Sequence, residues 1–157
     1  MSSAQKIDRG PLLGTLVRVV AQAMAERHAQ WLASSEFSDI QPAHSAAIQP
    51  LWDAPKGARI TDLARASRIT KQSMGALVDH LERKGYVERV PDPSDARASL
   101  VRLTARGRVF GRAVRALARE VEADWARRIG PGSVEQLRDA LERLRASLVE
   151  SDGETPH

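Results

Sequence analysis

Residues 60–104 have the sequence ITDLARASRITKQSMGALVDHLERKGYVERVPDPSDARASLVRLT, which predicts two short helices followed by a β-hairpin. Thr61 lies at the start of the first helical pattern and Thr70 at the start of the second, where each hydroxyl can accept hydrogen bonds from first-turn amides. Only two residues separate the patterns. Gly85 follows the second pattern, in the position where a left-handed residue ends a helix. This spacing predicts a helix-turn-helix.

The residues after Gly85 predict a wing beside the two helices. YVERVP and LVRLT are typical strands, and the polar segment DPSDARAS between them is rich in turn-forming residues. We expect a connection longer than a tight two-residue turn, with Arg97 at its tip. A helix-turn-helix followed by a hairpin is the order of a winged helix-turn-helix. We therefore predict a mainly α (α+β) fold in which residues 55–104 form the winged lobe with a two-stranded wing.

Apolar residues at spacings of three and four predict long helices on both sides of this lobe. One helix covers about 11–33, Pro42 begins a shorter helix that Pro50 kinks or shortens, and two more helices follow residue 105. Their stripes contain Leu13, Leu16, Val17, Val20, Met24 and Trp31, then Phe110, Val114, Leu117, Val121, Trp125 and Ile129, then Val134, Leu137, Leu141, Leu144 and Leu148. We expect residues 11–54 and 105–150 to form a homodimerisation region, because a second copy can cover these stripes.

The composition narrows the class of protein. Hydrophobic residues make up 42% and charged residues 28% of the 157 residues, which is ordinary for a folded soluble chain. No apolar run is long enough to span a bilayer and no signal peptide is recognisable, so we expect no membrane partner and a cytoplasmic location. The chain has no cysteine, which excludes disulfides and thiolate metal sites. Residues 1–10 and 151–157 are expected to be a disordered leader and tail.

The positive charge is concentrated in one part of the chain. Residues 60–108 contain ten Lys or Arg and six Asp or Glu, a difference of +4 that equals the net charge of the whole chain. A basic segment on an otherwise neutral chain is typical of a protein that binds a polyanion locally. A basic surface without a partner is the alternative.

The second predicted helix carries the side chains for base recognition. A helix that enters the major groove contacts base edges with its first residues, here Thr70, Lys71, Gln72 and Ser73. Gln pairs with adenine, and Lys with guanine or phosphate. A solvated polar helix start is the alternative. In the wing, Arg97 suits the narrow, negative minor groove, and Asp95 two residues earlier can orient its guanidinium. A solvated ion pair of the hairpin is the alternative there.

Three segments, LERKGYVER, the D-x-R of the wing and LVRLTARGR, resemble the MarR family of bacterial transcriptional regulators. The resemblance covers residues 60–108 in detail. It implies a homodimer with interlocked terminal helices, two winged lobes on a pseudo-palindromic operator of double-stranded DNA, and often a small-molecule effector that weakens DNA binding. It also implies that Arg97 is the minor-groove residue, Asp95 its partner, and the helix start at Thr70 the base reader.

The middle of the recognition helix departs from the family pattern. Many relatives carry a hydroxyl and a long polar side chain where this chain has Gly75 and Ala76, so Lys71, Gln72 and Ser73 take more of the readout. Close approach of the backbone to DNA and sequence drift are both explanations for the glycine. The candidate DNA-binding residues are Thr70, Lys71, Gln72, Ser73, Ala76, Arg83, Asp95 and Arg97.

Other residues suggest an effector pocket. Arg108, Arg112, Arg115 and Arg119 form a basic stripe that is a solvated face, a phosphate contact or an anchor for an anionic effector. The candidate pocket residues are Trp31, Trp52, Phe110 and Arg112, with Phe37 nearby; core packing is the alternative for the aromatic residues.

Motifs of catalysis and metal binding are absent from the sequence. There is no HExxH, Walker A, GxSxG or GxGxxG, so we expect no enzyme, cofactor or metal site. The sequence indicates a homodimeric, effector-responsive DNA-binding regulator that represses transcription. A winged-helix module for protein–protein interaction, without operator specificity, is the alternative class.

Overall fold

A computed structural model of the chain describes residues 10–152, with side chains as far as residue 148. The predicted leader and tail lie outside this range, apart from Gly10 and residues 151–152. The described residues divide into two compact units between Ala113 and Val114, and each unit is described by itself. No helix among the described residues is both long enough and apolar enough to cross a membrane.

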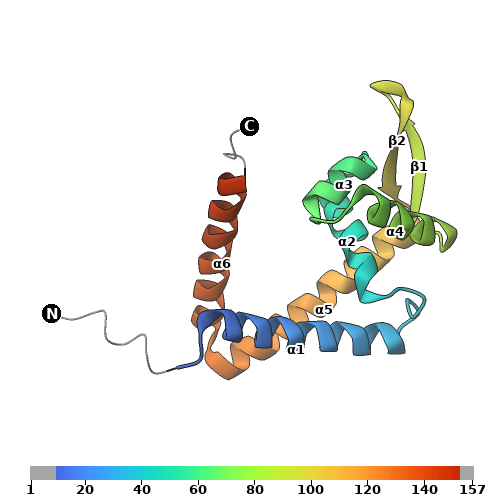
Figure 1. Cartoon of the computed structure of the whole chain (residues 1–157). Helices are drawn as coiled ribbons and strands as arrows, with labels where there is room; N and C mark the ends of the chain where they lie inside the picture. Colours follow the sequence, from blue (N-terminus) through green and yellow to red (C-terminus); the bar gives the residue numbers. More distant parts are fainter. Residues whose placement is uncertain (1–9, 153–157) are drawn as a thin grey trace. The chain divides into compact units, whose positions relative to one another are not determined.

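Residues 10–152 are mostly helical with one two-stranded antiparallel sheet, as predicted (Figure 1). The elements in chain order are α1 (Leu13–Ser34), the 3₁₀ turn η2 (Pro42–His44), α2 (Ser45–Ile48), the 3₁₀ turn η3 (Gln49–Asp53), α3 (Ile60–Ala66), α4 (Lys71–Arg83), β1 (Val87–Asp92), β2 (Asp95–Leu103), α5 (Ala105–Ile129) and α6 (Pro131–Asp152). As expected, a short helix begins at Pro42, and its α-helical part ends before Pro50.

Helices α3 and α4 form the helix-turn-helix around a shared apolar core. Leu63 and Ala64 of α3 are buried, as are Met74, Val78 and Leu81 of α4. The buried positions of α4 recur at four and three, so this helix has one buried face and one free face.

The two predicted helix caps have different outcomes. The Thr70 hydroxyl accepts a hydrogen bond from the Ser73 amide at 3.1 Å, which confirms the cap of α4. The prediction that Thr61 caps α3 is wrong. Arg59 has the extended backbone of a cap residue and α3 begins at Ile60, so Thr61 already lies inside the first turn.

The wing is an antiparallel hairpin whose register runs from Val87 opposite Leu103 to Pro91 opposite Ser99. Asp92 then pairs with Asp95, so the prediction of a longer connection is wrong and the turn contains two residues, Pro93 and Ser94. The Asp92 carboxylate explains the tight turn because it accepts hydrogen bonds from the Ser94 amide and hydroxyl, at 2.8 and 2.7 Å. The extra residues 96–98 form an irregularity in β2 next to the turn.

A short segment before α3 runs beside the wing. Ala58 exchanges two backbone hydrogen bonds with Val101 of β2, each 2.9 Å long. Gly57 makes this approach possible, since it has φ +97° and a Cβ there would lie 2.8 Å from the Val101 carbonyl oxygen. This segment joins the helix-turn-helix to the wing.

The end of the wing is fastened to the end of α4. The Thr104 hydroxyl donates to the Gly85 carbonyl at 2.6 Å and accepts from the Gly107 amide at 3.1 Å, so Thr104 caps α5. Gly85 has φ +76° and ends α4 as predicted. Gly107 is in close contact with the Tyr86 carbonyl oxygen, because a Cβ on Gly107 would lie 2.1 Å from that atom.

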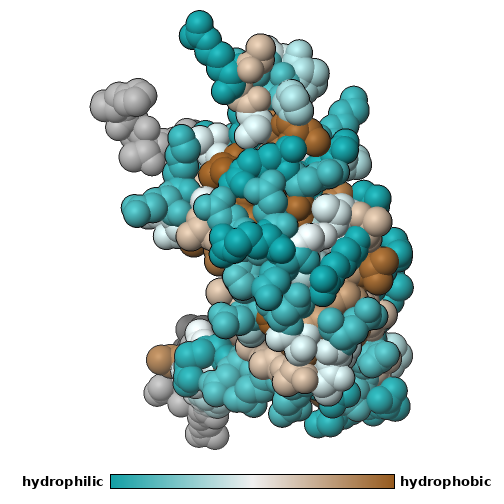
Figure 2. Space-filling model, turned by 90° about the vertical axis from the view of Figure 1, so that its right-hand side faces the viewer, coloured by the Kyte–Doolittle hydropathy of each residue, from teal (hydrophilic) through white to brown (hydrophobic). Residues whose placement is uncertain are grey.

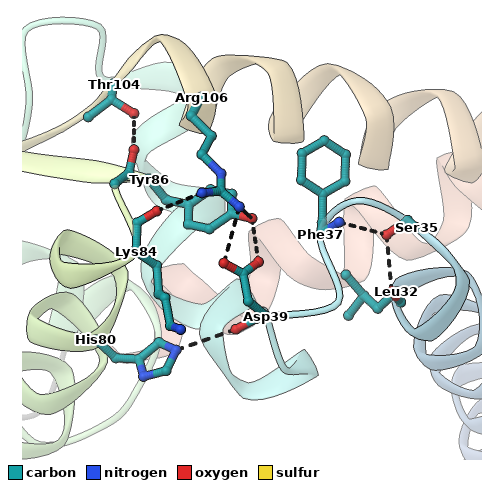
Figure 3. A network of polar contacts seen from close by, with 10 residues as sticks. Leu32, Ser35, Phe37, Asp39, His80, Lys84, Tyr86, Thr104 and Arg106 are labelled. Atoms are coloured by element: carbon teal, nitrogen blue, oxygen red, sulfur yellow. Dashed lines mark hydrogen bonds and ion pairs between the residues drawn. The ribbon is translucent and has the colours of Figure 1, made fainter.

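A polar network beside this junction joins the loop after α1 to the winged lobe (Figure 3). The Tyr86 hydroxyl donates to Asp39 at 2.7 Å, and the Arg106 guanidinium donates to Asp39 and to the Tyr86 oxygen at 3.1 and 2.9 Å. Burial and the Asp39 hydrogen bond, opposed by Arg106, raise the pKa of Tyr86 to about 12, so the phenol stays protonated as a donor. Arg106 also bonds the Lys84 carbonyl at 3.2 Å. The network fixes the loop against the C-terminal end of α4.

Candidate nucleic-acid interface

The predicted base-reading residues lie on the free face of α4. Because Met74, Val78 and Leu81 point into the core, the residues between them on the opposite face point outward. Six of the predicted residues are exposed: Thr70, Lys71, Gln72, Ser73, Ala76 and Arg83. The helix therefore presents amide, ammonium, hydroxyl and guanidinium groups to a partner.

Gly75 is not required by the packing of the protein. No atom lies within 4 Å of the place that a Cβ on Gly75 would occupy. By contrast, glycine in a helix interior costs about 1 kcal/mol relative to alanine. The fold thus gives no reason for the glycine, and the reason lies either outside the molecule or in sequence drift.

The acidic residues of α4 are held by Arg89 of β1. The Arg89 guanidinium forms ion pairs with Asp79 at 2.5 Å and with Glu82, and the Arg89 amide donates to Glu82 at 3.1 Å. One guanidinium is thereby shared by two carboxylates of the recognition helix, which offsets one of their two negative charges and lowers their repulsion of phosphate. Sequence reasoning missed this cluster, because its partners lie on separate elements.

The wing presents Arg97 to solvent. Arg97 is exposed and forms no ion pair with residues 10–148. We expected Asp95 to orient the Arg97 guanidinium. In the structure Asp95 Oδ1 instead accepts a hydrogen bond from the Arg97 backbone amide at 3.1 Å. A carboxylate two residues before an amide closes a local turn of this kind more easily than it reaches the end of a long side chain. The Arg97 guanidinium is therefore free to contact a partner molecule.

A further arginine, Arg59, connects the start of α3 with the turn of the wing. Its Nε and Nη2 atoms lie 2.7 and 2.6 Å from Asp92 Oδ2, and Nη2 lies 3.6 Å from Asp95 Oδ2. We call Arg59, Asp92 and Asp95 the wing clasp. The sequence carries no signal for Arg59, because it stands 33 residues from Asp92 and belongs to no motif.

The candidate effector residues are in part brought together. The Trp31 and Phe110 rings lie 6.2 Å apart, and Phe110 also packs edge-on against Phe37 at 5.2 Å and Tyr86 at 5.7 Å. Phe110 is only 1% exposed, which favours the core-packing alternative for this ring. Trp52 packs against Gly111, where a Cβ would lie 2.8 Å from its Nε1. Arg112 is exposed.

The side of the molecule drawn in Figure 2 is predominantly hydrophilic, and hydrophobic residues occur there in small, separate areas. This is the side on which α4 and the wing lie in Figure 1. A hydrophilic face suits contact with phosphates and base edges better than burial against apolar protein surface.

An exposed recognition helix, capped at its start and flanked by a wing with an exposed arginine, defines a winged helix-turn-helix domain. Residues 38–98 match the model of the MarR family. This match confirms the resemblance to that family of regulators seen in the sequence.

Individual relatives are more distant. The HTH-type transcriptional repressor Rv2887 of Mycobacterium tuberculosis is 28% identical over 117 residues, which cover 67% of this chain and 84% of the repressor. The transcriptional activatory protein BadR of Rhodopseudomonas palustris is 40% identical over 52 residues, and the match spans 33% of this chain and 30% of BadR. The crystal structure of Streptococcus pneumoniae FabT in complex with DNA has a TM-score of 0.76 at 20% identity, covering 88% of this chain and 96% of FabT. Rv2887 and BadR are regulators by name, and FabT is described in complex with DNA.

Proposed function

We propose that the chain is a homodimeric, sequence-specific DNA-binding regulator that acts on double-stranded DNA in the bacterial cytoplasm. The observation that carries the proposal is the pairing of two exposed features on one lobe, the start of α4 and Arg97 of the wing. In this proposal Thr70, Lys71, Gln72 and Ser73 enter the major groove, while Arg97 enters the adjacent minor groove. Arg83 contacts phosphate from the last turn of α4, and Ala76 faces the bases.

A homodimer is supported by apolar side chains on the terminal helices. In α1 the exposed residues include Leu13, Leu16, Val17, Val20 and Met24, and in α6 they include Leu137, Leu141, Leu144 and Leu148. Such rows of leucine and valine on one face of a helix are stable when another surface covers them. A dimer with two winged lobes would bind a site with two similar half-sites, which is a pseudo-palindrome.

Repression is the proposed sign of regulation, with release by a small molecule. The name of the Mycobacterium tuberculosis relative supports repression, although the shorter match is to a named activator. The proposed effector contacts are half-buried Trp31 and Trp52 and exposed Arg112, which suits an anion, whereas the buried Phe110 ring beside Trp31 is part of the core. His28 supports this location, because it stacks on Trp31 and its buried Nε2 has no hydrogen-bond partner among the described residues.

A genomic selection tests the proposal. Sheared DNA from the source organism is mixed with the tagged full chain, recovered and sequenced, and the expected result is enrichment of one pseudo-palindromic motif. Gln72→Ala is then expected to relax preference at particular base pairs, because its amide pairs with adenine. Uniform weakening at all sequences would contradict the role of Gln72 as a base reader. Recovery of DNA without any enriched motif would contradict operator recognition.

The alternative of a protein-interaction module predicts a different result. A winged lobe that docks a protein partner has no need of an excess of cations near the recognition helix, whereas residues 60–108 carry four more cations than anions. Absence of DNA binding at low salt, with the dimer intact, would favour that alternative.

A further inference from the structure

We propose that Arg59 is a positioning residue for DNA binding, and that it acts by holding the turn of the wing through Asp92 and Asp95. This inference rests on the proposed function, since it assumes that the wing binds DNA. It adds a residue that lies outside both the recognition helix and the wing.

The backbone before α3 brings Arg59 to the wing. Gly57 allows the chain to approach β2, and Ala58 pairs with Val101 through two hydrogen bonds. Arg59 follows Ala58 directly and is the residue before the first turn of α3. Its side chain therefore starts from a point that is fixed both to the wing and to the helix-turn-helix.

The two oxygens of the Asp92 carboxylate accept hydrogen bonds from different partners. Oδ1 accepts from the amide and hydroxyl of Ser94 and closes the turn, whereas Oδ2 accepts from the Arg59 guanidinium at 2.7 Å. The Asp92 side chain is 5% exposed, so most of its interactions are with the protein. The turn and the start of α3 are thus joined through one carboxyl group.

Asp95 extends the connection to the backbone of Arg97. Its Oδ2 lies 3.6 Å from Arg59 Nη2, and its Oδ1 accepts from the Arg97 amide at 3.1 Å. Residues 96–98 have no partner in the register of the two strands, so the ladder does not fix this part of β2. Arg59 and Asp95 supply a fixed point where backbone pairing is missing.

Arg59 also compensates the charge of the turn. Hydrogen bonds from Ser94 and the interaction with Arg59 lower the pKa of Asp92 to about 2, so this carboxylate is ionised at neutral pH. Without Arg59, two carboxylates at the tip of the wing would face DNA phosphates uncompensated. By holding the turn in place and by compensating its negative charge, Arg59 favours DNA binding in two ways.

A double-mutant cycle measures whether Arg59 acts through the wing. The affinities of wild type, Arg59→Gln, Arg97→Ala and the double variant are measured by fluorescence anisotropy on the duplex selected from the genomic experiment. We expect Arg97→Ala to weaken DNA binding about tenfold relative to the wild type, and Arg59→Gln to weaken it about fivefold. When Arg97 is already alanine, adding Arg59→Gln should weaken binding further by less than about twofold. Arg59→Lys should bind DNA more tightly than Arg59→Gln but less tightly than the wild type, because lysine restores the positive charge but not the two-nitrogen geometry of the guanidinium.

Arg102→Gln is the matched control. Arg102 pairs with Glu88 on the same hairpin at 2.7 Å, so this change also removes one cation and one ion pair. A general effect of charge would reduce affinity by the same factor with and without Arg97. We expect that additive behaviour for Arg102→Gln and coupled behaviour for Arg59→Gln.

Other outcomes of the double-mutant cycle would contradict either the positioning role of Arg59 or the DNA contact of the wing. Equal losses from Arg59→Gln in both backgrounds, or no loss in the wild type, overturn the positioning role and leave the proposed function intact. If Arg97→Ala binds as the wild type does, the wing contact is wrong and the role of Arg59 falls with it. If Arg59→Gln does not fold, Asp92→Asn takes its place in the cycle, since the amide oxygen can still accept from Ser94.

Discussion

At the scale of single residues, two glycines in helices illustrate how different the reasons for a glycine can be. Gly107, in the first turn of α5, is in contact with the Tyr86 carbonyl oxygen, and a Cβ there would be 2.1 Å from that oxygen. Gly75, in the recognition helix, has open space at the same position. One glycine is needed for packing and the other is not.

These two glycines give opposite predictions for stability. Gly75→Ala should raise the free energy of unfolding by about 1 kcal/mol, because alanine is the better helix former and meets no obstacle. Gly107→Ala should lower it by about 2 kcal/mol or more, because the Tyr86 carbonyl, just before β1, and α5 must separate. Urea denaturation followed by circular dichroism measures both. Similar effects of the two changes would contradict the close contact at Gly107.

DNA affinity of Gly75→Ala then separates the two explanations of the glycine. If the backbone of α4 approaches the bases at Gly75, the added methyl group weakens operator binding despite the higher stability. If the glycine results from drift, affinity stays as in the wild type.

At the scale of elements, a pair of histidines joins η2 to α4. The rings of His44 and His80 stack at 4.3 Å, and His44 Nδ1 accepts a hydrogen bond from the Gln41 amide at 2.9 Å. His44 is 6% exposed. Burial and the nearby charge of His80, partly opposed by Asp39, lower the pKa of His44. A proton on Nδ1 would also displace the Gln41 amide.

The lowered pKa predicts a loss of stability in acid. The unfolded chain binds a proton at His44 near the ordinary histidine value of about 6.5, whereas the folded chain does so only at lower pH. The contribution of His44 is therefore complete above that value and decreases as the pH falls below it. The free energy of unfolding should fall between pH 7.5 and 5.5, as measured by urea denaturation.

His44→Asn is the variant that isolates this effect. Its amide oxygen can accept from Gln41 but does not titrate in this range, so the dependence on pH should be weaker. Some dependence should remain, because burial also lowers the pKa of His28. An unchanged slope in the variant would show that His44 is not responsible.

The elements with periodic patterns could be predicted from the sequence, whereas the contacts between them could not. Thr70, Gly85 and the apolar positions of α4 follow local rules and were found where expected. The length of the connection was misjudged because residues 96–98 were assigned to it, whereas they belong to β2 as an irregularity beside the turn. The wing clasp was missed because its partners lie on separate elements, and a single arginine before a helix carries no local signal.

At the scale of the whole molecule, the exposed apolar residues of α1 predict association. Leu16 and Val20 are 47% and 42% exposed, and they lie on one face with Leu13 and Met24. Leu16→Glu should shift the protein from dimer to monomer, because it places a charge in an apolar interface. Sedimentation equilibrium measures the shift.

Gln22 provides the control for this change. It lies on the opposite face of α1, where its amide donates to Glu26 at 3.0 Å. Gln22→Glu adds the same charge and should leave the dimer intact. If both variants remain dimeric, the interface does not include this face of α1.

The most direct test of DNA recognition compares two duplexes of equal length, one with the selected motif and one with its bases scrambled. Competition binding at physiological salt should favour the motif by a factor on the order of a thousand or more, and both affinities should fall steeply as salt increases. The preference should persist as salt rises, because base contacts add to the phosphate contacts that both duplexes share. Equal affinity for the two duplexes would contradict sequence-specific recognition by α4 and the wing.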